Sequence, residues 1–570
     1  MKNKLKPFNF FKKNNANNIN ILSFKKNFSF NVSNSGQIFQ QQNEPKIQEP
    51  ADFETAIEAT GFGLYNCLLM LCAIPCAMAI GFDSTSLAFV LPVAQCDLEL
   101  TLFKKGTFNA ITYLGMVTTP FFWGFFADTF GRRKLLIFGF IFAGIFDIGA
   151  AIATNYWVLL IFKFLDGATI CGPFAVLTTY LAEMHGFQHR SKIVLFNGLC
   201  SSCINLILPA FAWAILPRNL VFQLFNGFLN YHSWNVFLFG AAMPALVAAS
   251  MVSLFPESPK FLMSLGKNNE ALQIFRTIYA LNTGNSKESY PIRVLYDETL
   301  EQNQQPITMT KRDSSFSLKS IRSTFGEKIS TGWQQIRPLF HKPYLSKIIL
   351  MFSTQHVAMI GLSTLRLWMP QLFSLISLYQ DKHPNESASL CTMISSGGSS
   401  HSNSTSLSEN FVLEDCIPGS VKDSVFINYM ILGATQAVFY LVAGAIIGYV
   451  GKKNITMVLL WVSGLLGFSM YLAQSSQQTL IFSALYLAFS SIAITCLISI
   501  STEVVPTSLR TMTVSLLMMC GRFGALFGNL LFPIFMEIDC VLPFLLVGGT
   551  TFVCGFAVYF LPKTDDKPLQ

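Results

Sequence analysis

Residues 124–134 read GFFADTFGRRK, and residues 444–453 read GAIIGYVGKK. Each stretch follows a long apolar run and ends in a glycine followed by basic residues, three in the first stretch and two in the second. The two stretches are in register, because Gly444 lies 320 positions after Gly124 (444 − 124) and the final glycines keep the same offset. This agreement predicts an internal repeat in the chain.

Charged residues further along the chain extend the repeat. Glu183 and Arg190 follow the fourth apolar run, and Glu503 and Arg510 follow the tenth at the same offset of 320 (503 − 183 and 510 − 190). No gap is needed across four apolar runs. The sequence therefore predicts two related halves, a design that some transporters use with the solute site between the halves.

The composition indicates a membrane protein. Of 570 residues, 52% are hydrophobic and 12% are charged, whereas soluble domains carry about 25% charged residues. The 39 basic residues are too dispersed for nucleic-acid binding. The 13 cysteines show no metal-ligand spacing, and we find no cofactor motif, Walker A loop, zinc-protease motif or nucleophile elbow. We therefore expect neither an enzyme nor an ATP-driven pump, and expect no cofactor or metal.

Apolar runs of the length that crosses a bilayer occur twelve times. They cover residues 62–92, 107–127, 134–154, 157–181, 193–216, 235–255, 347–376, 426–450, 455–475, 480–503, 512–536 and 541–561. The second and sixth runs have polar interruptions. The prediction is an all-α membrane protein with twelve transmembrane helices in two six-helix halves.

The spans define the expected domain organisation. It comprises a disordered basic tail (1–50), the N-terminal half (51–255), a cytosolic linker (256–346), the C-terminal half (347–563) with an outer loop (377–425), and a short tail (564–570). Basic residues gather on the side of both tails and the linker, which predicts that both termini are cytosolic.

The outer loop 377–425 has the opposite character. It holds six acidic residues and two lysines, and it contains glycosylation sequons at Asn385 and Asn403. Cys391 and Cys416 lie in the same loop, and we expect a disulfide between them if the loop is extracellular or lumenal. The protein is thus expected to be a glycoprotein of the plasma membrane or of a secretory or synaptic-type vesicle membrane.

Charged residues inside the spans are candidates for function, because charge within a bilayer costs about 2.5–3.5 kcal/mol on insertion scales. Asp83 in the first span is a candidate proton-coupling or substrate-binding carboxylate, and the alternative is a structural salt bridge. Arg366 in the seventh span lies at a similar depth and is its expected partner, an anion-binding group, or a side chain that reaches the outer surface. Lys163 and Asp166 share one helical face and form an expected pair. We interpret Asp147 as structural.

A second set of charges and glycines occupies the cytosolic loops. We expect it to form a latch that closes the inner gate, with Gly124 allowing two helices to approach closely. The alternative is that the basic residues only set topology. The set comprises Gly124, Asp128, Gly131, Arg132, Arg133, Glu183 and Arg190, with Glu503 and Arg510 as its second-half copies.

These residues resemble a known family. The stretch from Gly124 to Lys134 resembles the signature between the second and third spans of the major facilitator superfamily. Residues 255–262, FPESPKFL, look like the motif that ends span six in its sugar and organic-ion porter branches. Residues 53–63, Asp83 and the stretch 95–98, QCDL, look most like the synaptic vesicle glycoprotein 2 group.

The chain also departs from this family. Lys163 stands where the porter branch usually has Arg, and Asn235 stands at an often basic position. The outer loop is too short for the folded lumenal domain of synaptic vesicle glycoprotein 2 proteins. The resemblance implies a secondary transporter of a small polar or charged organic solute that works by alternating access, with membrane lipid, the solute and protons as partners. The alternatives are a non-transporting membrane protein of vesicle trafficking and an uncoupled facilitator.

Overall fold

The computed structural model describes residues 50–218, 220–224, 229–296, 341, 345–384, 388–398, 421–505 and 507–561. These residues fall within one compact unit, Glu49–Gln570. The predicted basic tail, the sequons at Asn385 and Asn403, and Cys416 lie outside the described residues.

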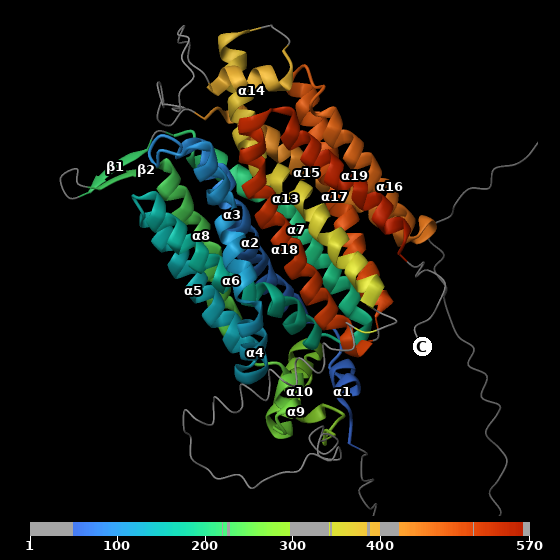
Figure 1. Ribbon diagram of the computed structural model, residues 1–570. Coiled ribbons are helices and arrows are strands. Elements are labelled where there is room, and N and C mark those ends of the chain that lie inside the picture. Colours follow the sequence, from blue (N-terminus) through green and yellow to red (C-terminus); the bar gives the residue numbers. More distant parts are fainter. Residues whose placement is uncertain are drawn as a thin grey trace, which may run out of the picture. The chain divides into compact units, whose positions relative to one another are not determined.

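The N-terminal half is built from long helices and one short hairpin (Figure 1). Its elements are α1 (Phe53–Ala59), α2 (Leu64–Val93), α3 (Leu102–Thr118), α4 (Pro120–Phe130), α5 (Arg132–Ile152), α6 (Tyr156–Glu183), α7 (Phe187–Ile215), β1 (Val221–Leu224), β2 (Leu229–His232) and α8 (Ser233–Ser253). The strands pair antiparallel, with Val221 opposite His232.

The linker contributes α9 (Pro259–Ser264), α10 (Asn268–Thr283) and the 3₁₀ turn η1 (Lys287–Ser289). The C-terminal half follows the same helical plan as the first. Its elements are α13 (Leu345–Lys382), α14 (Leu390–Gly398), α15 (Asp423–Val450), α16 (Lys452–Ser469), α17 (Ser476–Val504), α18 (Thr507–Ile538) and α19 (Val541–Tyr559).

A helix occupies each of the twelve predicted span positions. Among the described residues, nine helices are long and apolar enough to cross a membrane by themselves. The second predicted span is divided into α3 and α4 at Thr119, where Pro120 opens the next helix. Proline lacks the N–H that would continue the ladder of α3, and its fixed φ suits the first turn of a new helix.

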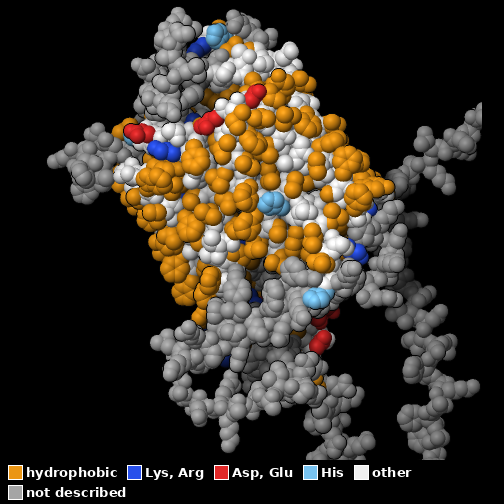
Figure 2. All heavy atoms as spheres, viewed as in Figure 1, with side chains coloured by type: hydrophobic (Ala, Val, Ile, Leu, Met, Phe, Trp, Pro, Cys, Tyr) orange, Lys and Arg blue, Asp and Glu red, His pale blue; other side chains and the backbone are white. Residues whose placement is uncertain are grey.

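Hydrophobic side chains cover most of the described surface in Figure 2, as expected for helices that face lipid. The halves meet where α3 packs on α18, α7 on α15 and α2 on α13. Within the N-terminal half, Gly115 of α3 and Gly167 of α6 allow close backbone approach. A Cβ on Gly167 would lie 2.1 Å from the carbonyl oxygen of Thr112, so α6 is seated firmly against α3.

The helices α1, α9 and α10 lie at one end of the helix bundle, and α14 of the C-terminal half lies at the opposite end (Figure 1). Asn282 of α10 fastens this layer to the start of α2. Its Oδ1 accepts from the backbone N–H of Tyr65 at 3.0 Å, and its Nδ2 donates to the carbonyl of Gly61 at 3.0 Å and to Oδ1 of Asn66 at 2.8 Å. The first part of the linker is therefore bound directly to a membrane helix.

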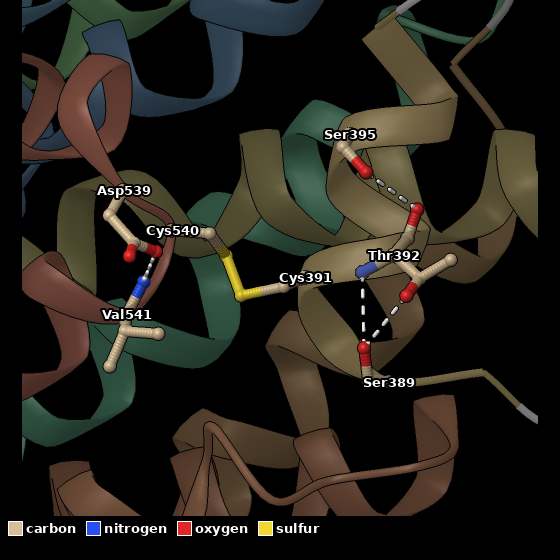
Figure 3. Close-up of a disulfide and its surroundings, with 7 residues drawn as sticks. All are labelled: Ser389, Cys391, Thr392, Ser395, Asp539, Cys540 and Val541. Carbon is tan, nitrogen blue, oxygen red and sulfur yellow. Dashed lines mark hydrogen bonds between the residues drawn. A yellow bond between two sulfur atoms is a disulfide. The ribbon is translucent and has the colours of Figure 1, made fainter.

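The disulfide of the outer loop differs from the predicted one. Cys391 of α14 is bonded to Cys540, in the turn between α18 and α19, with 5.8 Å between their Cα atoms (Figure 3). The prediction of a Cys391–Cys416 bond is therefore wrong. It considered only cysteines within the loop, whereas α14 brings its cysteine to the outer turn of another helix pair. Cys96, in the loop after α2, is also disulfide-bonded.

Candidate functional site

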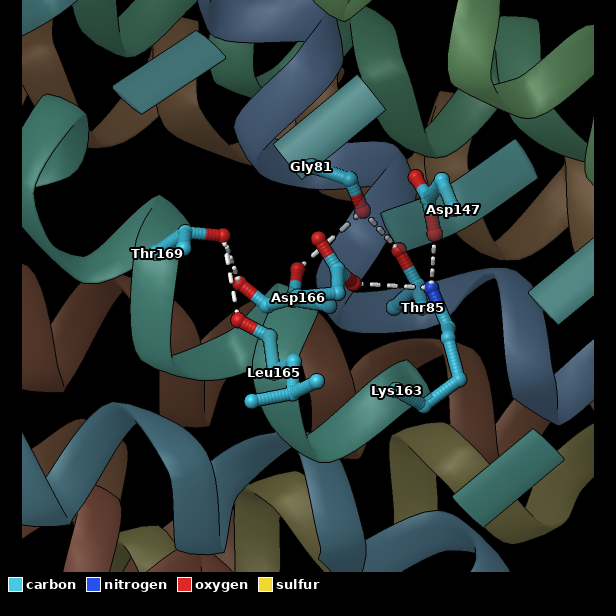
Figure 4. A network of polar contacts seen from close by, with 8 residues as sticks. Gly81, Thr85, Asp147, Lys163, Leu165, Asp166 and Thr169 are labelled. Carbon is cyan, nitrogen blue, oxygen red and sulfur yellow. Dashed lines mark hydrogen bonds and ion pairs between the residues drawn. The ribbon is translucent and has the colours of Figure 1, made fainter. Parts of the chain in front are cut away.

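Four charged side chains meet inside the N-terminal half. Asp83 comes from α2, Asp147 from α5, and Lys163 and Asp166 from α6; all are at most 2% exposed. The ammonium of Lys163 donates to Oδ1 of Asp147 at 2.5 Å and to Oδ2 of Asp166 at 2.9 Å (Figure 4). One oxygen from each of the three carboxylates lies within 4.8 Å of the others. We call these four residues the acidic cluster.

The predicted pair of Lys163 and Asp166 is present, because their spacing of three places both on one face of α6. The structural role interpreted for Asp147 stays a prediction; its ion pair with Lys163 was not foreseen from the sequence. Asp147 lies five residues before the end of α5 and Lys163 seven residues after the start of α6. At about 1.5 Å per residue both are about 8–11 Å below the shared turn, so their depths match.

Asp83 is the member of the cluster that the protein leaves unsatisfied. No donor among the described residues reaches either of its oxygens or Oδ1 of Asp166, and the carboxyl groups of Asp147 and Asp166 lie close enough to form a hydrogen bond with Asp83 when one of them carries a proton. The neighbouring hydroxyls do not help, because Thr85 donates to the carbonyl of Gly81 and Thr169 to carbonyls of its own helix (Figure 4). With one ammonium for three acids, full ionisation would leave two uncompensated negative charges in a buried site, which is costly. The cluster therefore favours taking up positive charge.

The charged residues around the loops after α4 and α6 form a second polar group, at the other end of α5 and α6. Nε of Arg132 lies 3.4 Å from Oε2 of Glu183, and the same oxygen accepts from the hydroxyl of Ser258 at 2.5 Å. The guanidinium of Arg132 also stacks over the ring of Phe261, 5.0 Å from its centroid. These contacts join the start of α5, the end of α6 and the start of α9, and we call them the inner latch.

Glu257 is a member of the inner latch that the sequence prediction missed. Its Oε1 accepts from the backbone N–H of Arg133 at 2.9 Å and from that of Ser258 at 3.0 Å. Gly131 provides the space: its φ of 97° favours glycine, and a Cβ there would lie 2.4 Å from Oε2 of Glu257. The signal was available, because the acid belongs to the quoted stretch 255–262.

Two further predictions about the latch need correction. Arg190 does not join Glu183; it pairs with Glu54 of α1 at 2.9 Å. Gly124 does not bring helices together, because a Cβ at this position would meet no atom within 4 Å. The side chains of Asp128, Glu503 and Arg510 lie outside the described part of the structure, so their place in the latch stays a prediction.

His185 lies beside the latch, in the short connection between α6 and α7. Its ring is fully buried, and its Nδ1 is 2.7 Å from the carbonyl oxygen of Leu181. Burial lowers the pKa of His185 to about 4, against a smaller opposing effect of that hydrogen bond. The imidazole is therefore neutral at physiological pH.

A sequence model of the Major Facilitator Superfamily matches residues 73–400 and 392–570. The chain belongs to the major facilitator superfamily. Superfamily members are transporters and not enzymes, so the absence of a catalytic motif from the sequence agrees with this membership.

Within the superfamily, the chain is related to the synaptic vesicle glycoprotein 2 branch. It is 29% identical to rat (Rattus norvegicus) synaptic vesicle glycoprotein 2B over 243 residues, which are 42% of this chain and 35% of that protein. It is 24% identical to human (Homo sapiens) synaptic vesicle glycoprotein 2A over 341 residues, 58% of this chain and 45% of that protein. The chain thus spans less than half the length of these relatives.

Solved structures confirm the superfamily fold. The partially occluded, inward-open xylose transporter XylE from E. coli superposes with a TM-score of 0.58 at 15% identity, over 88% of this chain and all of that one. Its inward-open form gives a TM-score of 0.59 at 14% identity, over 88% of this chain and 98% of that one. At these identities the likeness concerns the fold alone.

Arg366 of α13 does not meet the acidic cluster of this superfamily member. Among the described residues, no ion pair joins Arg366 to Asp83, so the predicted pairing is wrong. Similar depth in the membrane does not fix which way a helix face points. Asp83 faces α5 and α6 of its own half, whereas Arg366 lines a pocket with residues of α7, α15 and α17.

Proposed function

We propose that the protein is a secondary transporter of a small polar or charged organic solute and couples solute movement to protons through the acidic cluster. The observation that carries the proposal is Asp83, which is 1% exposed, receives no hydrogen bond from a donor in the described residues, and lies beside the carboxyl groups of Asp147 and Asp166. A buried acid without a counter-ion is an unstable arrangement unless the acid binds a proton or a cation.

The chemistry of the cluster favours a proton over a metal ion. The ammonium of Lys163 already stands within hydrogen-bond distance of Asp147 and Asp166, where it supplies the positive charge that a metal would bring. A proton on Asp83 removes one negative charge without needing further ligands. Loss of this proton restores the repulsion among the three carboxylates, which favours a rearrangement of α2 against α5 and α6. Proton binding and helix packing are then linked.

The inner latch would supply the gate of the same cycle. Its contacts join the N-terminal half to the start of the linker, and they fix the loop after α4 against α6 and α9. We propose that the second-half residues Glu503 and Arg510 complete the closed gate with Asp128. Rocking of one half against the other then alternates access to the midplane.

The disulfides support an orientation in the membrane. Cys391 and Cys540 are joined at the end of the helices opposite α9 and α10, and Cys96 follows the outer end of α2. Disulfides persist in oxidising compartments. We therefore propose that this end is extracellular or lumenal, that both termini are cytosolic, and that the protein resides in the plasma membrane or in a secretory or vesicle membrane.

The test is solute uptake by proteoliposomes that contain the purified protein. A panel of neutral, anionic and cationic solutes is offered with an imposed pH gradient, with a sodium gradient, or with neither. We expect uptake of at least one solute to rise when the outside is acid. Asp83→Asn should abolish this stimulation while exchange of solute at equal pH continues, and Glu288→Gln, an exposed acid of the linker, serves as the control.

The alternatives give different results. A rate of uptake that does not change with either gradient identifies an uncoupled facilitator. A rate that rises only with the sodium gradient identifies a sodium site. Failure of every solute to enter, with correctly folded protein in the liposomes, favours the non-transporting role in vesicle trafficking.

A further inference from the structure

A groove lies between the start of α5 and the linker helices, at the end of the bundle that carries α9 and α10 (Figure 1). Its walls are formed by the end of α4, the first turn of α5, α9 and the start of α10. The space open to water-sized molecules is about 280 Å³, about twenty times the 10–15 Å³ that admits one water. A group much larger than water therefore fits.

The groove carries an excess of positive charge. Three basic and two acidic side chains line it: Arg133, Lys134, Lys267, Glu257 and Glu270. Both acids are already engaged. Oε1 of Glu257 accepts from two backbone N–H groups, at 2.9 and 3.0 Å, and Oε1 of Glu270 lies 3.0 Å from the ammonium of Lys267. Among the described residues, no carboxylate lies within ion-pair distance of Arg133 or Lys134. The groove thus offers two cations that have no counter-ion.

The side chain of Arg133 is fixed in position but incompletely hydrogen-bonded. Its Nη2 donates to the carbonyl oxygen of Ser253 at 2.6 Å, whereas its Nε is buried and meets no acceptor in the described part of the chain. Buried donors normally have a partner. An anion in the groove would meet a guanidinium that is already positioned to bind it.

Lys134 lies at the edge of the surface that faces lipid. It shares one face of α5 with Phe138 and Phe142, four and eight residues further on, which are 56% and 46% exposed. Phe138 is about 6 Å from Lys134 along the helix axis. Phe130 and Leu265, which also line the groove, are exposed as well. Basic and apolar side chains therefore stand together where a phospholipid changes from acyl chain to phosphate.

We propose that this groove binds the phosphate of an anionic phospholipid from the adjacent leaflet. Arg133 and Lys134 hold the phosphate oxygens, arginine through its planar fork and lysine as a compact charge. Phe130 and Leu265 contact the acyl chains beside it. Basic pockets on the cytosolic side of membrane helices bind acidic lipid headgroups, and this end is cytosolic in the orientation proposed above. The lipid joins the start of α5 to the linker whether or not a solute is moved.

The test is native mass spectrometry of the purified protein in detergent, which counts the lipids that the protein retains. The probes are phosphatidate and phosphatidylcholine with the same acyl chains. Both carry a phosphate, but the choline group cancels its charge. We expect phosphatidate to be retained more strongly, because the lining has positive charge to spare.

Single variants should change phosphatidate binding in opposite directions. Lys134→Gln should weaken it by about fivefold, the effect of one cation near a membrane surface. Glu270→Gln removes an acid from the groove and releases Lys267, so it should strengthen binding by up to about fivefold. Loss of folding cannot cause such a gain. Lys287→Gln, which changes an exposed lysine of the linker outside the groove lining, should bind like the wild type.

Three results would overturn the inference. Equal retention of the two lipids, or equal losses in Lys134→Gln and Lys287→Gln, would mean that general attraction between charges explains the binding. A Glu270→Gln protein that binds phosphatidate no better than the wild type would exclude the groove as the site. Displacement of phosphatidate by inorganic phosphate or glycerol 3-phosphate at similar concentration would assign the groove to a soluble phosphate. None of these measurements requires transport, so failure of this site and failure of the proposed function are distinguishable.

Discussion

Gly131 and Gly124 belong to one loop signature, and the structure predicts opposite effects when each is changed to alanine. Gly131 has φ 97° and ψ 162°, a region that residues with a side chain occupy at a cost of about 1–3 kcal/mol. An added Cβ would also lie 2.4 Å from Oε2 of Glu257. The carboxylate can move aside, but only by weakening its hydrogen bonds to the backbone of Arg133 and Ser258, worth about 1 kcal/mol each.

We therefore expect Gly131→Ala to destabilise the inner latch by about 2–4 kcal/mol. Gly124 lies within α4, where a Cβ would meet open space. Alanine is a better helix former than glycine by about 1 kcal/mol, so Gly124→Ala should be neutral or slightly stabilising. Thermal and denaturant unfolding of the purified variants would measure both effects.

Transport gives the second readout of the same pair. A weakened latch should reduce uptake by Gly131→Ala protein present at normal levels in the membrane, whereas Gly124→Ala should transport normally. If Gly131→Ala protein is as stable as the wild type, or if the two variants lose stability equally, the account of how Gly131 accommodates Glu257 is refuted.

Two further predictions concern the ends of the helices. Cys540→Ser should leave Cys391 free, so that a membrane-impermeant maleimide labels it from the outer side, and should lower the free energy of unfolding by about 2–4 kcal/mol. If Cys391 stays unreactive in this variant, the result would contradict the observed bond. Cys67→Ser is the control. His185, with its pKa lowered to about 4, binds a proton in the unfolded chain below pH 6.5 but not in the native protein until about pH 4. The free energy of unfolding should therefore fall by about 2 kcal/mol between pH 7 and pH 5 on account of this group. In the His185→Gln variant, the free energy of unfolding should depend less steeply on pH by that amount. An equal pH dependence in the two proteins would argue against the burial of a neutral imidazole.

The order and number of the spans could be read from the sequence because a bilayer imposes length and hydropathy on every helix that crosses it. The internal repeat added the division into halves. The pair of Lys163 and Asp166 was also predictable, since residues three apart share a helical face. The spans and the pair depend on local pattern, and the repeat depends on a match within the sequence itself, so none of the three requires the arrangement of the helices.

Partners on different helices were harder to predict. Depth suggested Arg366 as the partner of Asp83, but depth leaves the rotation of each helix undetermined, and the two side chains face different neighbours. The contact between Asp147 and Lys163 could have been predicted by counting residues along α5 and α6 from the turn that joins them, because both side chains then lie at a similar depth. Glu54 pairs with Arg190, which is distant from it in the sequence, and no local pattern predicts such a contact.

The hydrogen bonds of Asn282 have a mechanical consequence. They bind α10 to the first turn of α2, so α10 should move together with α2 when α2 tilts. The end of α10 farther from this attachment carries Asn269, which is exposed. A spectroscopic probe placed there should follow the tilt of the membrane helices from the aqueous side, so the rocking of the N-terminal half becomes measurable without any label inside the bilayer.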